Sequence, residues 1–202
     1  MDLQDQFAGM VHGVKNQLQL LGPSVETLCA NQSSEVSQAG ISIGNVLDEI
    51  NHQLVLMLSL YRLEDAKIFS TQEVHLIDIL ETACSRMKDV RIEVNCTDEL
   101  VVFCDERLVT AVVGDALHNA IRYCQNRILV TGQLKDDGVV ICIEDDGDGL
   151  EKGQETDLDS TGLGIELARR VAQAHRRGNQ LGDVSLGCSE ALGGARFSLY
   201  LP

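Results

Sequence analysis

Apolar residues recur every seven positions through the first third of the chain. In residues 4–29 they form two rows, Phe7, Val14, Leu21 and Leu28, and Val11, Leu18 and Val25. In residues 35–66 the rows are Val36, Ile43, Ile50 and Met57, and Gly40, Leu47, Leu54 and Tyr61. Two rows offset by four positions form one apolar stripe along an α-helix, so the pattern predicts two long amphipathic helices.

The polar segment 31–34 separates these two helices. A turn this short joins antiparallel neighbours, so residues 1–66 are expected to form a helical hairpin. A single hairpin leaves much of its apolar stripe exposed, whereas two copies close into a four-helix bundle. The sequence therefore predicts a homodimer through residues 1–66.

From about residue 70 the spacing changes to short alternating elements. Helices are expected at 74–87, 105–123 and 161–175, and strands at 91–96, 100–103, 127–134, 139–144, 183–188 and 195–201. The acidic turn at 135–138 indicates a β-hairpin. Mixed helices and mostly antiparallel strands predict an α/β domain over residues 67–202, built as a two-layer α+β sandwich.

Composition limits the classes of function. Hydrophobic residues make up 44% of the chain, which is enough for a packed core. The chain has no run of about 18 apolar residues and no signal-peptide start, so no membrane span and a cytoplasmic location are expected. The net charge of −15 and the 3% of aromatic residues disfavour a nucleic-acid surface. The seven cysteines contain no C-x-x-C pair and are expected to be buried thiols.

Three short blocks carry candidate chemistry. Asp115 and Asn119 lie four residues apart on one face of a predicted helix, where both side chains can meet a Mg²⁺ ion. The alternative is that Asn119 only satisfies a local backbone group. The second block, residues 143–150, lies at the end of a strand, and its glycines allow the backbone to approach a ligand closely. Most acidic glycine turns, however, only reverse the chain.

The third block, residues 160–164, opens a predicted helix. Free N–H groups at a helix start, preceded by glycines, form a phosphate cradle. A G-x-G pattern before a helix is weak evidence by itself. Backbone N–H groups and a divalent cation can nevertheless hold an anionic nucleotide on an acidic protein.

In this order the three blocks resemble the N, G1 and G2 boxes of the histidine-kinase ATPase domain. That family shares the Bergerat-type fold of gyrase, Hsp90 and MutL. The closing segment 193–202 resembles the terminal strand of the family. The resemblance covers roughly residues 70–202, and the combination of blocks is far more specific than any single block. It implies ATP and Mg²⁺ as cofactors.

The resemblance assigns roles to the residues of the N block. Asn119 would hold Mg²⁺, with Asp115 alongside. Arg122 would approach the phosphates, and Tyr123 would pack beside the nucleotide.

The G1 and G2 blocks would form the rest of the nucleotide site. Asp145 would read the adenine amino group, with Gly147 and Gly149 shaping that wall. The G2 block would cradle the phosphates through Thr161, Gly162, Leu163 and Gly164. Residues 150–160 would form a short lid, and Ser160 stands where the family usually has a glycine.

The segment 11–18, VHGVKNQL, resembles the phospho-acceptor box of the same family. His12 follows Val11 of the apolar stripe and is therefore expected on an exposed flank of the bundle. There it would take phosphate from ATP and exchange it with the aspartate of a response-regulator receiver domain. The alternative is an ordinary surface histidine, and His52, His75, His118 and His175 are assigned structural or surface roles.

Gly13 departs from the family, which usually has Asp or Glu directly after the histidine. That carboxylate draws the imidazole proton, and loss of such a base costs about 10²–10⁴ in rate. Asn16 matches a position that orients water for phosphatase activity in related proteins. The pair Gly13 and Asn16 therefore permits a protein biased towards dephosphorylation, with sensory input from another chain or from a missing segment.

Two alternatives stay open beside the histidine kinase. Gly13 and the short lid are also compatible with a degenerate ATP-binding protein that docks a partner without transferring phosphate. The third possibility is an anti-sigma-factor-type serine kinase, which would not need the heptad hairpin. Transfer of label from γ-labelled ATP to His12 separates the first from the second, and a monomer with a serine substrate would favour the third.

Overall fold

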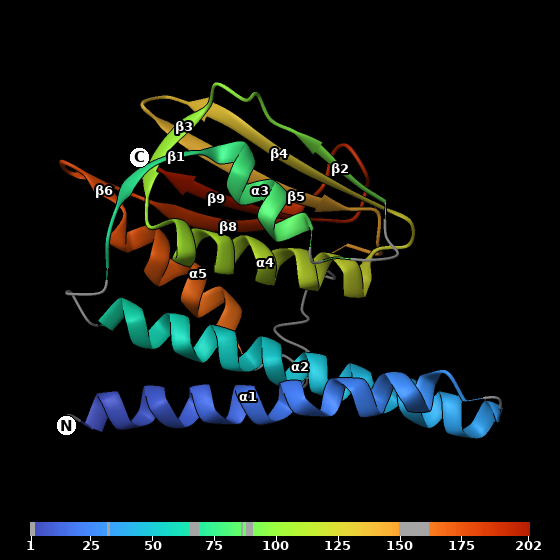
Figure 1. The fold of residues 1–202 in the computed structure, drawn as a ribbon. Helices are drawn as coiled ribbons and strands as arrows, with labels where there is room; N and C mark the ends of the chain where they lie inside the picture. The colour runs from blue at the N-terminus through green and yellow to red at the C-terminus, as the bar shows by residue number, and fades with distance from the viewer. Residues whose placement is uncertain (1–2, 32, 65–68, 86, 88–90, 150–161) are drawn as a thin grey trace. The chain divides into compact units, whose positions relative to one another are not determined.

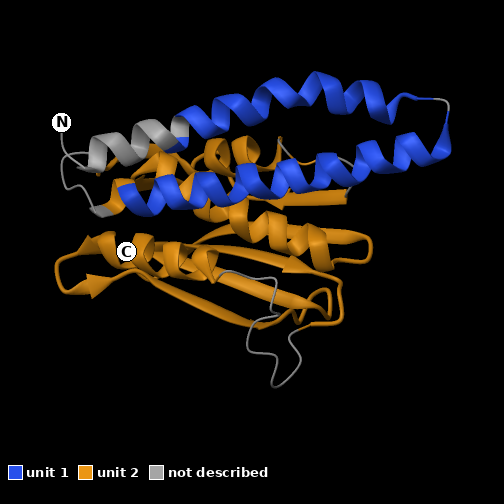
Figure 2. Cartoon of the chain, turned by 90° about the horizontal axis from the view of Figure 1, so that it is seen from below, with its two compact units in different colours: residues 1–61 blue, residues 62–202 orange. Residues whose placement is uncertain are grey.

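The computed structural model describes residues 3–31, 33–64, 69–85, 87, 91–149 and 162–202. The chain divides into two compact units, Met1–Tyr61 and Arg62–Pro202, coloured separately in Figure 2. The sequence places this boundary a few residues later, at 66/67. Residues 65–68, which span this predicted boundary, lie outside the described part of the chain.

The first unit is formed by two antiparallel helices, α1 (Leu3–Cys29) and α2 (Ser34–Glu64), which lie side by side in Figures 1 and 2. Close to the turn, the Ser37 hydroxyl donates a hydrogen bond to the Cys29 carbonyl at 2.8 Å. A Cβ atom on Gly40 would lie only 2.7 Å from the backbone nitrogen of Cys29. The small residue in the heptad row thus lets the two backbones approach closely, and helices form where the period of seven predicts them.

The two heptad rows differ in burial. One row is buried or half-buried throughout: Val11, Leu18, Val25, Gly40, Leu47, Leu54 and Tyr61. In the other row the central positions remain 37–49% exposed: Val14, Leu21, Ile43, Ile50 and Met57. The single chain therefore leaves half of the predicted apolar stripe open to solvent.

The second unit is a mixed α/β domain (Figure 1). Its main sheet has the order β2-β4-β5-β9-β8, with β2 parallel to β4 and the other pairs antiparallel. These strands are β2 (Arg91–Asn95), β4 (Arg127–Lys135), β5 (Gly138–Asp145), β8 (Asp183–Cys188) and β9 (Ala195–Leu201). Two small sheets pair β1 (Gln72–His75) with β3 (Val101–Cys104) and β6 (Arg176–Arg177) with β7 (Gln180–Leu181).

Three helices cover one face of the main sheet: α3 (Leu76–Cys84), α4 (Glu106–Tyr123) and α5 (Leu163–Ala174). Alternate strand residues face them and are almost fully buried, including Ile128, Val130, Ile141, Ile143, Leu199 and Leu201. The residues between them, such as Thr131, Cys142 and Ser198, pair in register on the opposite face. This arrangement is the two-layer sandwich that the mixed pattern predicts.

The structure corrects the expected helix at 74–87. Val74 and His75 belong to β1, where Val74 is buried and both of its neighbours are exposed, and the helix begins at Leu76. Pairing with β3 therefore outweighs the helical pattern over these residues. The strands β6 and β7 were not expected, whereas 183–188 and 195–201 are strands as predicted. None of the described helices is long and apolar enough to cross a membrane.

Candidate functional site

The N block lies on α4, whose start is capped by the Asp105 carboxylate accepting from the Leu108 N–H at 3.2 Å. Asp115 is buried, while Asn119, one turn later, is exposed. The Asn119 Nδ2 group lies 3.4 Å from Asp115 Oδ2 as a hydrogen-bond donor. This contact leaves the amide oxygen of Asn119 to other partners, so the helix presents a carboxylate and an amide oxygen on one face.

The first turn of α5 packs directly on Asp115. A Cβ atom on Gly164 would overlap the Asp115 carboxylate, lying 2.6 Å from its Cγ. Gly162, the residue before the helix, has a left-handed backbone with φ of +67°, which glycine adopts without strain. The structure thus brings the G2 block against the N block, with the free N–H groups of the α5 N-terminus beside Asp115.

The G1 block spans the end of β5, where Asp145 is a buried carboxylate. Asp145 Oδ1 accepts hydrogen bonds from the backbone N–H groups of Gly147 at 2.9 Å and Ala195 at 3.1 Å. Its Oδ2 has no donor among the residues that the structure describes. One oxygen is therefore fixed by the backbone, and the other is left to accept from a ligand.

Gly147 joins the G1 block to the end of α4. A Cβ atom at this position would overlap the Tyr123 carbonyl oxygen and lie 3.1 Å from the Tyr123 carbonyl carbon. Gly149 has a positive φ of +79°. All three blocks therefore meet around α4: the G2 block near its middle and the G1 block at its C-terminal end.

Arg122 and Tyr123 lie exposed at the end of α4. The Arg122 guanidinium carbon stands 5.6 Å from the centre of the Tyr123 ring, a cation–π contact. Because the Tyr123 carbonyl packs against Gly147, both residues lie next to the G1 block.

Several predicted residues cannot be placed by their side chains. Thr161 and the expected lid, 150–160, lie outside the described residues. His12 lies within α1, but its side chain is also outside the described part. Asn16 is exposed one turn further along α1, and a Cβ atom on Gly13 would meet no atom within 4 Å.

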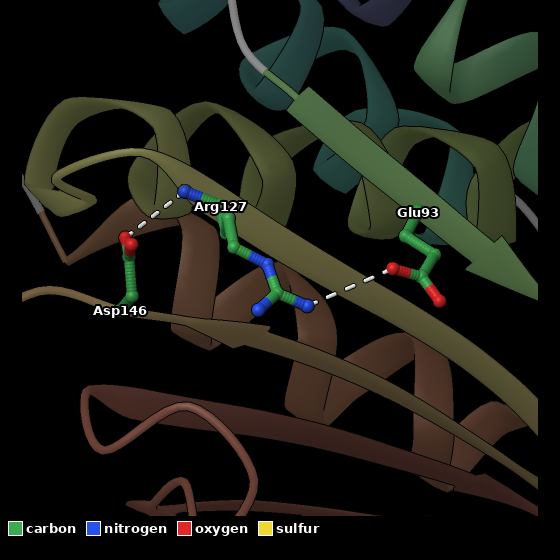
Figure 3. Close-up of polar contacts among 3 residues, drawn as sticks. All are labelled: Glu93, Arg127 and Asp146. Carbon is green, nitrogen blue, oxygen red and sulfur yellow. Dashed lines mark hydrogen bonds and ion pairs between the residues drawn. The ribbon is translucent and has the colours of Figure 1, made fainter.

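Asp146 has a structural role that sequence reasoning missed. Its carboxylate accepts from the backbone N–H groups of Gln125, Asn126 and Arg127 at 2.8–3.1 Å. These hydrogen bonds, that of Asn126 first, lower the pKa of the carboxyl below its ordinary value. Figure 3 shows the bond to Arg127, whose guanidinium reaches Glu93 of β2 at 3.7 Å. Asp146 therefore anchors the loop between α4 and β4 to the G1 block.

His175 closes the C-terminal end of α5. Its Nδ1–H donates to the Val171 carbonyl at 2.6 Å, and its Nε2 accepts from the Asp105 N–H at 2.9 Å. Phe69 meets the ring edge-on at 5.3 Å between centroids. Burial lowers the pKa of the imidazole. The neutral ring thus links α5 to the cap of α4, so of the structural or surface roles expected from the sequence His175 has a structural one.

A shallow hollow of about 510 Å³ lies elsewhere on the domain. Its walls come from β4, β5, β8 and β9 and include Lys135, Val140, Ser185 and Arg196. It contains no residue of the three blocks, so it is separate from the candidate site.

Similarity to known proteins agrees with this geometry. Residues 104–202 match the family described as histidine kinase-, DNA gyrase B-, and HSP90-like ATPase. The chain is 25% identical over 208 residues to the virulence sensor histidine kinase PhoQ of Salmonella typhimurium and to the sensor protein PhoQ of Escherichia coli. Each alignment covers 94% of this chain and 41% of the relative, so the chain spans less than half the length of these proteins.

Solved histidine kinases share the fold. The Acinetobacter baumannii histidine kinase AdeS superposes with a TM-score of 0.60 at 17% identity, covering 96% of this chain and 93% of that one. The ATP binding domain of PrrB from Mycobacterium tuberculosis gives a TM-score of 0.54 at 25% identity, covering 65% and 96%. The match over residues 104–202 and the shared fold thus identify a histidine kinase-type ATPase domain in this chain.

Proposed function

We propose that the chain is the kinase core of a two-component sensor that binds Mg-ATP, phosphorylates His12 and exchanges phosphate with a response-regulator aspartate. The observation that carries the proposal is the meeting of the three blocks around α4. Gly164 packs on Asp115, Gly147 packs on the end of the same helix, and Asp145 keeps one oxygen for a ligand. The similarity to sensor histidine kinases over 94% of the chain supports the same interpretation.

The nucleotide would be held at two ends. Asp145 Oδ2 would accept a hydrogen bond from the exocyclic amine of adenine, with Gly147 and Gly149 allowing the base to approach the backbone. The phosphates would lie at the N-terminus of α5, where the amides of Thr161, Gly162, Leu163 and Gly164 are the natural donors. Arg122 would supply a cation for the phosphates, and Tyr123 would pack beside the nucleotide.

Asp115 and Asn119 fit a magnesium ion. Mg²⁺ prefers oxygen ligands and usually keeps several waters, so one amide oxygen with a carboxylate beside it is sufficient protein ligation. Asn119 is exposed, and its amide oxygen takes no part in the contact with Asp115. A bound Mg²⁺ ion would neutralise charge on the triphosphate.

The first unit would form the dimer and carry the phospho-acceptor. The exposed heptad row gives α1 and α2 a continuous apolar surface that a second copy can bury in a four-helix bundle through residues 1–66. His12 lies between Val11 of the buried row and Val14 of the exposed row. Action in the cytoplasm fits seven cysteines that are all free thiols.

Gly13 sets the balance between the two activities. Without a carboxylate after His12, no adjacent base draws the imidazole proton, so phosphorylation of His12 is expected to be slow. Asn16 can orient water towards a phosphorylated aspartate, which would bias the protein towards dephosphorylating its response regulator. Input would reach this core from another chain or from a segment that precedes it in a longer protein.

Phosphotransfer from γ-labelled ATP tests the proposal. The wild-type protein should acquire slow, alkali-stable label, and His12→Ala should acquire none. A carboxylate fits at position 13 because the space around it is open, so Gly13→Glu should label faster by about 10²-fold. Gly13→Gln is the matched control, since it adds the same bulk without a base, and it should label like the wild type.

Two results would reject the kinase reaction. Undiminished label in His12→Ala would place the phosphate on another residue, as expected for a serine kinase. Absence of label in both the wild type and Gly13→Glu, with ATP bound, would favour the docking protein instead. The specific observation behind that second candidate is Gly13 itself.

A further inference from the structure

We propose that Ser189 and Glu144 are positioning residues that fix the adenine-reading carboxylate of Asp145 and so determine the preference for adenine. Ser189 lies outside the N, G1 and G2 blocks, and Glu144 is the G1 residue that directly precedes Asp145. The inference rests on the proposed nucleotide site and adds a specificity determinant to it.

The carboxylate of Asp145 is held by the end of the turn 189–194. The Ala195 N–H donates to Asp145 Oδ1 at 3.1 Å, and the Gly194 N–H donates to the Asp145 carbonyl at 3.1 Å. A Cβ atom on Gly194 would overlap Asp145 Oδ1 and lie 2.5 Å from the Gly147 nitrogen. Backbone from the end of the chain thus packs directly on the acceptor group, and any shift of this turn moves the donors of Oδ1.

Ser189 holds the turn together from inside. Its N–H donates to the Gly194 carbonyl at 2.8 Å, and its carbonyl accepts from the Gly193 N–H at 3.0 Å. Its hydroxyl oxygen also accepts from the Leu192 N–H at 2.9 Å. One residue therefore contacts three others of the turn, including the glycine that packs on Asp145.

Glu144 ties this turn to the sheet. The Ser189 hydroxyl donates to Glu144 Oε1 at 2.9 Å, and both residues are buried, at 4% and 7% exposure. A hydrogen bond to a buried carboxylate is among the stronger ones in proteins, and its loss leaves a charged group underpaired. Since Glu144 directly precedes Asp145 on β5, the same strand end carries both the anchor of the turn and the group that the turn positions.

The consequence is a carboxylate with unequal oxygens. Two backbone donors engage Oδ1, so Oδ2 is left to accept a hydrogen bond from the adenine amine. If the turn loosens, Oδ1 loses a donor and the carboxylate can rotate. A nucleotide whose base has a carbonyl in place of the amine then loses less binding affinity relative to ATP. General loosening of the domain would instead weaken the binding of all nucleotides to the same extent.

The test compares Mg-ATP with Mg-inosine triphosphate, which carries a carbonyl where adenine has its amine. Calorimetric titration should give a wild-type preference for ATP of at least about tenfold, the value of one hydrogen bond to a charged group. Ser189→Ala should lower this ratio about tenfold, whereas Ser189→Thr, which keeps the hydroxyl, should retain most of it. Ser185→Ala, an exposed serine on β8, is the matched control and should keep the wild-type ratio.

Other results would overturn either this inference or the proposed function on which it rests. A folded Ser189→Ala with an unchanged ratio overturns it while leaving ATP binding intact. Should Ser189→Ala fail to fold, Glu144→Gln replaces it, because this variant keeps an acceptor oxygen but loses the charge. Its ratio should fall about threefold, and an unchanged ratio again overturns the inference. A wild-type protein that binds neither nucleotide rejects the proposed function itself, and one that binds both equally rejects amine reading by Asp145.

Discussion

Single residues without side chains decide how closely the parts of the candidate site approach one another. Gly164 allows the start of α5 to rest on the Asp115 carboxylate, and Gly147 allows the G1 block to rest on the Tyr123 carbonyl. Any larger residue at either position would have to displace backbone or a buried carboxylate, which costs about 1–3 kcal/mol. The packing of the site thus depends on these glycines as much as on the polar residues.

His175 makes the stability of the domain depend on pH. In the unfolded chain its imidazole has an ordinary pKa of about 6.5, whereas burial lowers the pKa in the folded state. As pH falls below about 6.5, the unfolded chain binds a proton that the folded chain does not. The contribution of His175 to the free energy of unfolding should therefore be constant above about pH 6.5. It should decrease as the pH falls from about 6.5 to the pKa of the folded state.

Urea denaturation at pH 7.5 and 5.5 measures this effect, with His175→Gln as the comparison. The variant should be less stable by about 1–3 kcal/mol at pH 7.5, because the Asp105 N–H loses a well-placed acceptor. It should also lose less stability than the wild type on acidification. An identical pH dependence in the two proteins would show that His175 does not titrate as described.

At the scale of elements, α4 organises the domain. Its first turn receives the Asp105 cap and the His175 link, its middle carries Asp115 and Asn119, and its last residue contacts Gly147. One helix therefore connects the start of α5, the end of β5 and the cap into a single structural unit. A ligand that binds at any of these points is coupled to the others through a rigid element.

Elements with local periodicity could be predicted from the sequence. Both long helices follow from the heptad rows, and β8 and β9 follow from alternation between turns. The strand β1 could not be recognised, because Val74 is in a strand only through pairing with Val102 of β3. Tertiary pairing of this kind leaves no local pattern.

The candidate site shows the same limit. The order of the three blocks indicates which residues to consider, but their contacts join distant parts of the chain. Nothing near Gly164 reveals that it packs on Asp115, and nothing near Ser189 reveals its bond to Glu144. Asp146 was overlooked because its backbone partners belong to another loop.

At the scale of the whole molecule, the exposed heptad row is the main feature to explain. Val14, Leu21, Ile43, Ile50 and Met57 are spaced by seven along both helices of the first unit, and each is at least 37% exposed. Scattered surface apolar residues are common, but a regular row along two neighbouring helices indicates an interface. We expect a second copy of the chain to bury it.

Charges placed in this row should separate the dimer. Ile43→Glu combined with Ile50→Glu would bury four like charges in each bundle. Sedimentation of this variant should give the mass of one chain, whereas the wild type should give the mass of two chains. Asn45→Glu adds a charge at an exposed polar position of the same helix and should remain dimeric. A wild-type monomer, or a charged variant that stays dimeric, would exclude the bundle through residues 1–66.

The most direct test of the nucleotide site is calorimetric titration of Mg-ATP into the wild type, Gly164→Ala and Gly114→Ala. The wild type should bind one ATP per chain. Gly164→Ala should bind at least about tenfold more weakly, because the start of α5 can no longer rest on Asp115. Gly114→Ala, on α4 but with no atom within 4 Å of the added carbon, should bind as the wild type does. No heat with the wild type, or equal affinity in all three proteins, would contradict a nucleotide site between α4 and α5.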